Sequence, residues 1–355
     1  MISTNQLSKV INPNPGWYRG DFHVHTNESD GIYLPDLVEE LAIAEGLDFI
    51  AYTDHNTIEG YKKLRKDLNF IVIPGIEMSL DKGHFNVFGM DEWRDWMDDF
   101  YGNIREISLP TRYRSENELI TKIADQGLLT SINHPLLAPW AWQYADTDLR
   151  RIHCLEIWND LYWPENISAN PNAVNMWSKW LNAGHRITAI GGSDYHSPPR
   201  PEEGIFGERL GFPTTFVYAD ELSVGGILEG VRKHRVYVSR GIMVNFEAEI
   251  NDQIFGIGED VGKQVGQITF TATILSEFST TQAQLIKNGQ IIKVVQAEGK
   301  EAIISFKDTL DAVDPAWYRL EISVPDGQVM AITNPIFTGP HREPTIFKFG
   351  DFFKY

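Results

Sequence analysis

The segment Asp21–Thr26, with the sequence DFHVHT, decides how the first part of the chain is interpreted. Alternate residues of a β-strand share one face, so the imidazoles of His23 and His25 are expected to point the same way. Similar apolar runs recur along the chain and alternate with helix-like segments. They cover residues 48–53, 70–77, 128–133, 152–158, 186–191 and 212–218, with a shorter run at 84–90. Strand followed by helix, about seven times over, predicts an α/β fold with parallel strands closed into a (β/α) barrel.

The pattern changes near Gly241. Later strand-like segments cover 268–275, 283–287, 291–296, 302–306, 317–324 and 329–333, and turn signals such as Asn288-Gly289 separate them. Since no strong helix pattern interrupts them, they predict a small antiparallel β-sandwich. The expected division is a lead-in at 1–19, a barrel at 20–243, a β-sandwich at 244–338 and a tail at 339–355.

Composition limits which classes of molecule the protein is expected to bind. The 355 residues carry a formal net charge of −18 and one cysteine, Cys154. The acidic excess has no basic arm, so we expect no binding to duplex nucleic acid. No apolar run is long enough for a signal peptide or a membrane span, so we expect a cytoplasmic protein that acts on small molecules. Self-association through the β-rich part is one expected role for that part.

Polar residues with metal-binding side chains collect at the predicted strand ends. Six of the ten histidines stand there, together with three carboxylates. The candidate metal ligands are His23, His25, Asp30, His55, Glu77, His84, His134, Asp194 and His196. A single histidine at a strand end is usually an ordinary core or surface residue, but a parallel barrel would gather all nine on one face. Mixed imidazole and carboxylate ligands suit zinc, manganese or iron, so the sequence predicts up to three divalent ions.

The motifs HVHT, SDG, TDH, PGIE, GHFNVFG, NHP and SDYH together resemble those of the PHP (polymerase and histidinol phosphatase) family. The later segments EIWN, VRKHRVYVSRG, WYRLEI and TNPI are similar to a carbaryl-hydrolase-like branch in which a β domain follows the barrel. This resemblance implies a distorted seven-stranded barrel and a trinuclear centre. It implies one ion on His23, His25, Glu77 and Asp194, a second on Glu77, His84 and His134, and a third on Asp30, His55 and His196. Many members have a histidine near the position of Asp30, and an aspartate there should favour manganese or iron over zinc.

The resemblance implies a metal-dependent hydrolase. Ions sharing a water would lower its pKa and make hydroxide available for attack on an ester. A phosphoesterase is the leading hypothesis, a carboxyl or carbamate ester hydrolase is the alternative, and a non-catalytic metal-binding or accessory module is the third.

Several residues are candidates for supporting roles. Asp21 or Asp54 could orient a ligand histidine, and Asp54 is also the candidate proton donor. Arg200 could bind a substrate anion, although a solvated surface arginine is the alternative, and Asn159 could contact substrate. The tryptophans 140, 142, 158, 163, 177 and 180 could form a substrate wall or belong to the core, and residues 91–114 could cover the site as a lid.

Overall fold

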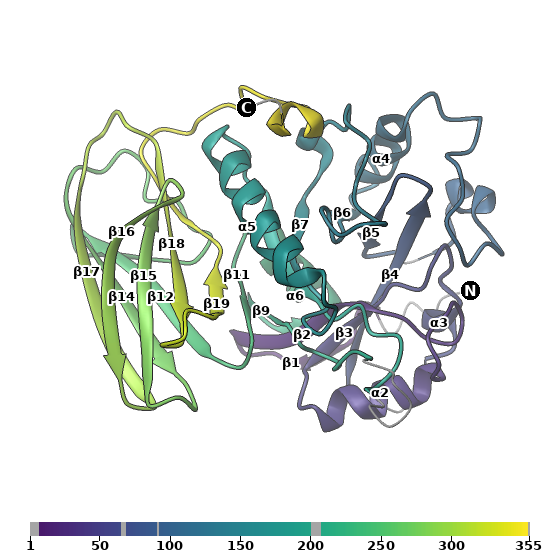
Figure 1. Cartoon of the computed structure of the whole chain (residues 1–355), viewed down its shortest axis with the longest axis horizontal. Coiled ribbons are helices and arrows are strands. Elements are labelled where there is room, and N and C mark those ends of the chain that lie inside the picture. Colours follow the sequence, from purple (N-terminus) through teal and green to yellow (C-terminus); the bar gives the residue numbers. More distant parts are fainter. Residues whose placement is uncertain (1–6, 65–68, 91, 200–206, 354–355) are drawn as a thin grey trace.

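The computed structural model describes residues 7–64, 69–90, 92–199 and 207–353 (Figure 1). Its first part is built on two sets of parallel strands. β2 (Gly16–Val24), β3 (Phe49–Tyr52) and β4 (Ile71–Leu80) form one set, and β6 (Leu129–Ile132), β7 (Cys154–Asn159) and β8 (Thr188–Gly192) form the other. The end of β8 returns to β2, where the His25 N–H donates to the Tyr195 carbonyl at 2.9 Å. The sheet therefore curls and brings the carboxyl ends of these strands together.

Two strands of this part run against the expected parallel order. β5 (Gly83–Phe88) lies antiparallel between β4 and β6, because the two residues between β4 and β5 allow a hairpin and no crossover. β9 (Thr214–Ala219), the last strand predicted for the barrel, runs antiparallel to β2. β9 therefore enters the sheet in the direction opposite to that of β2.

The helices follow the predicted positions with different bounds. α2 (Pro35–Ala44) and α4 (Glu116–Ala124) lie where apolar periodicity indicates them. α5 (Asn166–Asn182) starts seven residues before the helix that apolar periodicity predicts at 173–183, because Pro171 and the asparagines beside it interrupt the apolar pattern of the first turns. The short α3 (Glu59–Lys62) and α6 (Val224–Arg232) complete the set of α-helices in the described ranges. No helix in those ranges is long and apolar enough to cross a membrane.

The second part is β-rich. One sheet has the order β13 (Gln253–Gly256), β12 (Met243–Ile250), β14 (Gly266–Leu275) and β17 (Glu301–Leu310). Facing it lie β16 (Gln290–Glu298), β15 (Thr280–Lys287), β18 (Ala316–Ser323) and β19 (Val329–Thr333), with β20 (Ile336–Thr338) on β18. Phe246 and Phe270 of the first sheet share one apolar core with Leu285 and Leu320 of the second. Burial of alternate apolar side chains accounts for the pairing of the two sheets.

The two parts share hydrogen-bonded strands. β11 (Val236–Ser239) pairs with β9 on one side and with β19 on the other, so one sheet continues from the histidine-bearing strands into the β-rich part. Phe216 of β9 and Tyr237 of β11 stack at 4.5 Å and belong to the β-rich core. This hydrogen-bonded sheet therefore joins strands from both sides of the expected division at residue 243.

Both expected terminal segments contain ordered structure. Within the lead-in, β1 (Val10–Asn12) pairs with β10 (Leu222–Ser223), and β2 already begins at Gly16. At the other end, the 3-10 helix η4 (Phe349–Phe353) places Phe349 and Phe352 against Trp180 of α5 (Figure 1). The segment predicted as a tail thus packs back onto the first part of the chain.

Candidate metal centre

All nine predicted metal ligands lie at one end of the first part. His23 lies in β2, His25 directly follows that strand, and the loop beyond supplies Asp30. His55 follows β3, His134 follows β6, and Asp194 and His196 follow β8. Glu77 was expected at the end of its strand but lies inside β4, because β4 continues to Leu80 in its hairpin with β5. His84 stands near the start of β5, and this antiparallel start meets the same end of the sheet.

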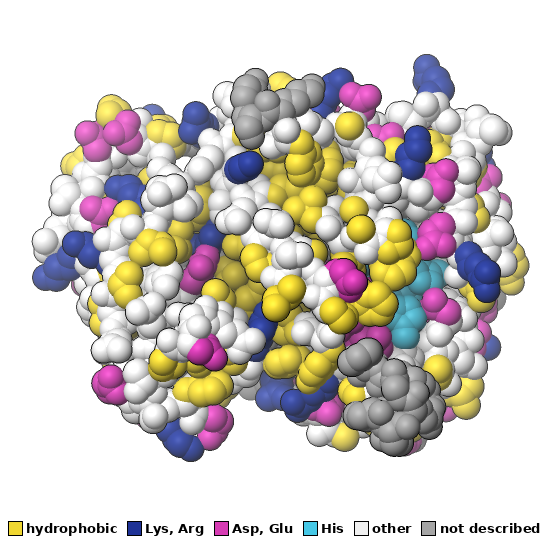
Figure 2. Space-filling view, viewed as in Figure 1, with side chains coloured by type: hydrophobic (Ala, Val, Ile, Leu, Met, Phe, Trp, Pro, Cys, Tyr) yellow, Lys and Arg dark blue, Asp and Glu magenta, His cyan; other side chains and the backbone are white. Residues whose placement is uncertain are grey.

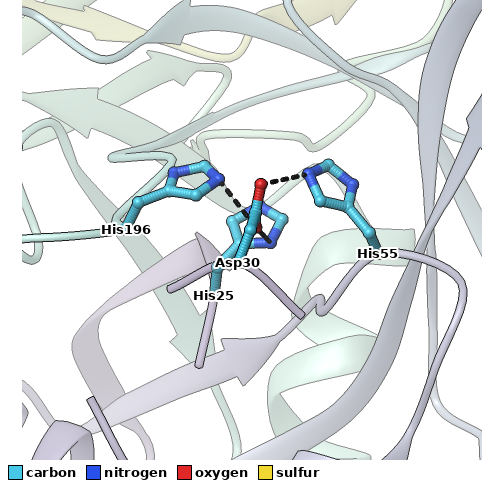
Figure 3. A group of neighbouring side chains, drawn as sticks. All are labelled: His25, Asp30, His55 and His196. Atoms are coloured by element: carbon cyan, nitrogen blue, oxygen red, sulfur yellow. Dashed lines mark ion pairs between the residues drawn. The ribbon is translucent and has the colours of Figure 1, made fainter. Parts of the chain in front are cut away.

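Four of these side chains converge in the first cluster, His25, Asp30, His55 and His196 (Figure 3). Asp30 Oδ1 lies 3.2 Å from His196 Nε2 and 3.8 Å from His25 Nδ1. Asp30 Oδ2 lies 3.6 Å from His55 Nε2. This cluster contains the group predicted to hold the third ion, with His25 added.

A second cluster contains His23, His25, Glu77 and Asp194. The Nε2 atoms of His23 and His25 both lie 3.1 Å from Asp194 Oδ1, and they lie 3.3 Å and 3.4 Å from the Glu77 carboxylate. These are the four residues predicted to hold the first ion.

A third cluster contains His55, Glu77 and His84. Glu77 Oε1 lies 3.3 Å from His84 Nδ1 and 3.4 Å from His134 Nε2. The group predicted for the second ion is therefore gathered around Glu77, with His55 beside it. Glu77 touches members of both this cluster and the second, which is the position that a bridging carboxylate would need.

Several buried polar atoms at this site have no hydrogen-bond partner, and their chemistry shows whether cations would fit there. His23 Nε2, His25 Nε2, Glu77 Oε2, both ring nitrogens of His84 and His134 Nδ1 are all buried and make no hydrogen bond. Leaving one such group unsatisfied costs about 1–3 kcal/mol. Imidazole nitrogens and carboxylate oxygens are the ligands of transition-metal ions, so the donor set fits divalent metals.

The pKa values show how strongly burial and neighbouring charges act on these groups. Although burial opposes ionisation of Glu77, His23, His55 and His84 hold the pKa of this carboxyl well below its usual range. Burial, together with the nearby rings of His196 and His55, lowers the pKa of His25 to about 3. His25 is therefore a neutral imidazole at physiological pH, which is the form that binds a metal.

Glu156 contacts two of the candidate ligand histidines. Its Oε1 lies 2.9 Å from His23 Nδ1, and its Oε2 accepts the backbone N–H of His134 at 2.7 Å and the Asn159 side-chain amide at 3.2 Å. A carboxylate on the second ring nitrogen fixes the orientation and tautomer of a ligand histidine. In the sequence, Glu156 could not be distinguished from a structural residue of its strand.

Asp21 and Asp54 do not take the orienting role predicted for them. Asp21 accepts hydrogen bonds from the backbone N–H groups of His23, Ser193 and Gly211 and from the Ser193 hydroxyl. Asp54 accepts from the Thr26 N–H and hydroxyl and from the Ser29 hydroxyl. Each buried carboxylate is satisfied by nearby backbone and hydroxyl donors, so it holds loops in place and contacts no ligand ring. Asp54 also does not line the cavity, where a proton donor would have to lie.

A cavity of about 510 Å³ opens onto the ligands. In Figure 2 the histidine side chains lie in a hollow beside acidic and hydrophobic side chains. Besides seven of the candidate ligands, the cavity is lined by Ile104, Arg105, Glu106, Leu137, Trp140, Asn159, Asp160, Trp163 and Glu208. The predicted substrate contact Asn159 therefore lies at the site, whereas Arg200 lies outside the described residues.

The tryptophans divide between cavity and core. Trp140 and Trp163 line the cavity, and their rings lie 5.8 Å apart. The rings of Trp177 and Trp180 are fully buried in the core, and Trp142 and Trp158 are also buried. Of the segment predicted as a lid, residues 104–106 reach the cavity.

Four charged residues of the cavity were missed in the sequence. Glu106 Oε1 lies 3.6 Å from His84 Nε2, and the interaction with this ring lowers the pKa of Glu106 to about 2. Glu208 Oε2 accepts the backbone N–H groups of His196 and Ser197. Arg105 and Asp160 complete the set. None of the four belongs to a strand that carries a ligand motif, and only tertiary folding brings them to the site.

No protein-family model matches the sequence. A crystal structure from Bacteroides vulgatus ATCC 8482 is described as a two-domain protein containing a predicted PHP-like metal-dependent phosphoesterase. It is 19% identical, covers 93% of this chain and 99% of that one, and has a TM-score of 0.44. An amidohydrolase from Chromobacterium violaceum, solved with bound sulfate and no metal, is 15% identical. It covers 53% of this chain and 90% of its own, with a TM-score of 0.38.

The description of the Bacteroides structure applies to that protein, and the carbaryl-hydrolase-like branch stays a prediction. Among curated proteins, the chain is similar to the uncharacterized protein MJ1587 of Methanocaldococcus jannaschii. The two are 30% identical over 131 residues, which cover 33% of this chain and 67% of the archaeal protein. By this relationship, the chain belongs to the same protein family as MJ1587.

Proposed function

We propose that this protein is a metal-dependent hydrolase of ester bonds, with phosphoesters as the leading substrates. One observation carries the proposal: buried imidazole and carboxylate atoms without hydrogen-bond partners surround a cavity large enough for a small molecule. Such an arrangement is costly for a purely structural role, and cations would remove the cost.

The nine candidate ligands would hold up to three divalent ions, with Glu77 shared between two of them. The carboxylate of Asp30 replaces one imidazole nitrogen by oxygen, which favours manganese or iron over zinc. Ions bound there would polarise the ester and lower the pKa of water.

Other residues of the chain would position the ligands and the substrate. Glu156 fixes the ring of His23 through Nδ1. The Asn159 amide lies 3.3 Å from Asp194 Oδ2 and holds that carboxylate toward the histidines. Arg105 lines the cavity and offers a guanidinium to a phosphate group. This cation favours the phosphoester over an uncharged ester.

A carboxyl or carbamate ester is the second candidate, and the apolar side of the cavity favours it. Leu137, Trp140, Trp163 and Ile104 line the same space as the ligands. They would bury an apolar acyl or alcohol group, and an uncharged ester would not require Arg105.

The test is to measure the metals per chain by elemental analysis and to assay the same sample with three substrates. These are p-nitrophenyl phosphate, bis-p-nitrophenyl phosphate and p-nitrophenyl acetate. His23→Ala should lose metal and activity, whereas His341→Ala, a change at an exposed histidine, should lose neither. Bound metal with turnover of the phosphates supports the leading function, and turnover of acetate alone supports the second.

Full metal occupancy without turnover of any of the three substrates would favour the third hypothesis, a non-catalytic metal-binding module. Absence of bound metal, with none gained on adding manganese, iron or zinc, would overturn the whole proposal.

A further inference from the structure

One carboxyl group of the cavity has no function in the site described above. Asp160 follows Asn159 at the end of β7, lines the cavity and is 6% exposed. Its Oδ1 accepts the Tyr162 N–H at 3.0 Å, and no hydrogen bond to Oδ2 is found in the described part of the chain. One oxygen of this carboxyl group is therefore available to a molecule in the cavity.

The backbone holds Asp160 in place. Its N–H donates to the Gly192 carbonyl at 3.2 Å, and its own carbonyl accepts from the Trp163 N–H and from the Asn166 side chain at 3.0 Å. Its φ of 21° lies in the left-handed region, which is uncommon for residues other than glycine. Such conformations persist where the surrounding structure enforces them, and they cluster at functional sites.

The other carboxylates of the cavity already have partners. Those of Asp30, Glu77, Asp194 and Glu106 face histidines, and that of Glu208 accepts two backbone N–H groups. Like Glu208, Asp160 has neither a cation nor a histidine side chain as partner among the described residues, but its carboxyl group accepts a single backbone N–H, whereas that of Glu208 accepts two. It is thus distinct from the candidate ligands.

The surroundings of Asp160 favour its protonated form. Burial is the main cause, and the carboxylates of Glu208 and Asp194 add to it, while the Tyr162 N–H acts in the opposite direction. The result raises the pKa of Asp160 to about 7. The histidine and arginine side chains that line the same cavity would act against this shift in their charged forms; they are His55, His84, His134, His196 and Arg105. A carboxyl group that keeps its proton near neutral pH can donate it.

We propose that Asp160 is the general acid that protonates the leaving-group oxygen; this inference rests on the hydrolase function proposed above. A water oxygen forms the new bond to phosphorus, or to the carbonyl carbon of a carboxyl ester, and its proton passes to solvent. The bond to the leaving oxygen breaks, and its electron pair stays on that oxygen. The Asp160 O–H proton is transferred there, and the carboxylate regains a proton from water.

The experiment compares Asp160→Asn with the wild-type holoenzyme on two phosphates that differ in the leaving group. p-Nitrophenyl phosphate releases a stable anion that needs no proton, whereas an alkyl phosphate such as propyl phosphate needs one. The variant should lose about 100- to 10,000-fold in kcat/KM on propyl phosphate. On p-nitrophenyl phosphate it should lose less than about tenfold. If the wild type cleaves only carboxyl esters, propyl acetate and p-nitrophenyl acetate replace the two phosphates.

Two variants and the metal content control the test. Glu165→Gln, at an exposed carboxylate five residues away, should leave both rates unchanged. Asparagine and glycine both tolerate positive φ, so Asp160→Gly provides a second variant without the acid should Asp160→Asn fail to fold.

An equal loss on both substrates would overturn the assignment, because a structural or positioning role predicts no dependence on the leaving group. Loss of metal from the variant would also overturn it, by making Asp160 a ligand. Absence of turnover by the metal-loaded wild type would instead overturn the proposed hydrolase function, and the inference with it.

Discussion

The candidate metal centre and the β-rich part bury side chains of opposite character. Around the ligands, histidine and carboxylate atoms are buried without hydrogen-bond partners. Among the described residues from Met243 onward, no buried side-chain polar atom lacks a partner. There the core is apolar, and Phe270 contacts the rings of Phe246 and Tyr318. The described β-rich part therefore pairs its own buried polar side-chain atoms, whereas the candidate metal centre leaves such atoms without partners.

Because of this difference, we expect the β-rich part to contribute mainly to stability and the candidate metal centre mainly to function. Apolar burial stabilises the β-rich part without any ligand. The candidate metal centre instead buries polar groups without hydrogen-bond partners, at a cost that the rest of the fold must offset. Changes in the two regions should therefore affect different measurements, although β11 joins them in one sheet.

The largest effect on stability is expected in the β-rich core. Phe270→Ala removes a fully buried ring and should lower the free energy of unfolding by about 3–5 kcal/mol. Urea denaturation measures this, and elemental analysis of the same sample should find unchanged metal per chain. Loss of metal in this variant would mean that the continuous sheet couples the two regions.

The largest effect on function is expected at Glu77. Glu77→Gln removes the charge shared by two ligand clusters and should reduce both metal binding and hydrolysis by more than about a hundredfold, because even outer partners of ligands contribute 10–100-fold. Metal titration and steady-state kinetics measure the two losses. Glu321→Gln, in the β-rich part, is the matched control. Retention of all metal by Glu77→Gln would refute its bridging role.

A smaller effect on metal binding is expected at Glu156, which contacts candidate ligands but is not one of them. Glu156→Gln keeps the size of the side chain but weakens its interactions with His23 and with the His134 N–H, so metal affinity should fall by about 10–100-fold. Competition with a chelator gives the affinity. An unchanged affinity would assign Glu156 to packing alone.

The smallest effect concerns a histidine outside the site. Burial, with Arg186 nearby, lowers the pKa of His234 to about 4, so the folded protein keeps it neutral while the unfolded chain takes up a proton near pH 6.5. Because the unfolded state binds more protons, this residue should lower stability by about 2 kcal/mol as pH falls from 7 to 5.

His234→Asn should remove that part of the pH dependence. Asparagine tolerates the φ of 58° found there and can replace the ring nitrogen that bonds the Thr188 hydroxyl. Urea midpoints at the two pH values measure it. The same pH slope in wild type and variant would contradict the prediction.

Motifs in the sequence identified the candidate ligands because each places a metal-binding side chain in a predicted strand or just after it. DFHVHT, PGIE and SDYH supply His23, Glu77 and Asp194 in this way, and the structure brings all three together. Arg200 lies outside the described residues. Asp54 was misplaced because its position beside His55 in sequence gives no information on the direction of its side chain, which faces Thr26 and Ser29.

The residues that surround the ligands were decided by tertiary structure. Glu106 reaches His84 from a loop, Glu208 reaches the His196 backbone from the segment after β8, and Asp160 is held by hydrogen bonds from β8 and α5. These contacts depend on chain path and on loop conformation, which leave no periodic pattern in sequence.

By itself the sequence determined an α/β part with metal-binding side chains on its strands, followed by a β-rich part, because periodicity and local motifs encode which residues are strands and which faces they share. Only the tertiary structure decided that β5 and β9 run antiparallel, that β11 joins the two parts, and that Asp160 faces the cavity. Strand direction and side-chain contacts depend on long-range packing, and the energy of that packing is spread over residues far apart in the chain.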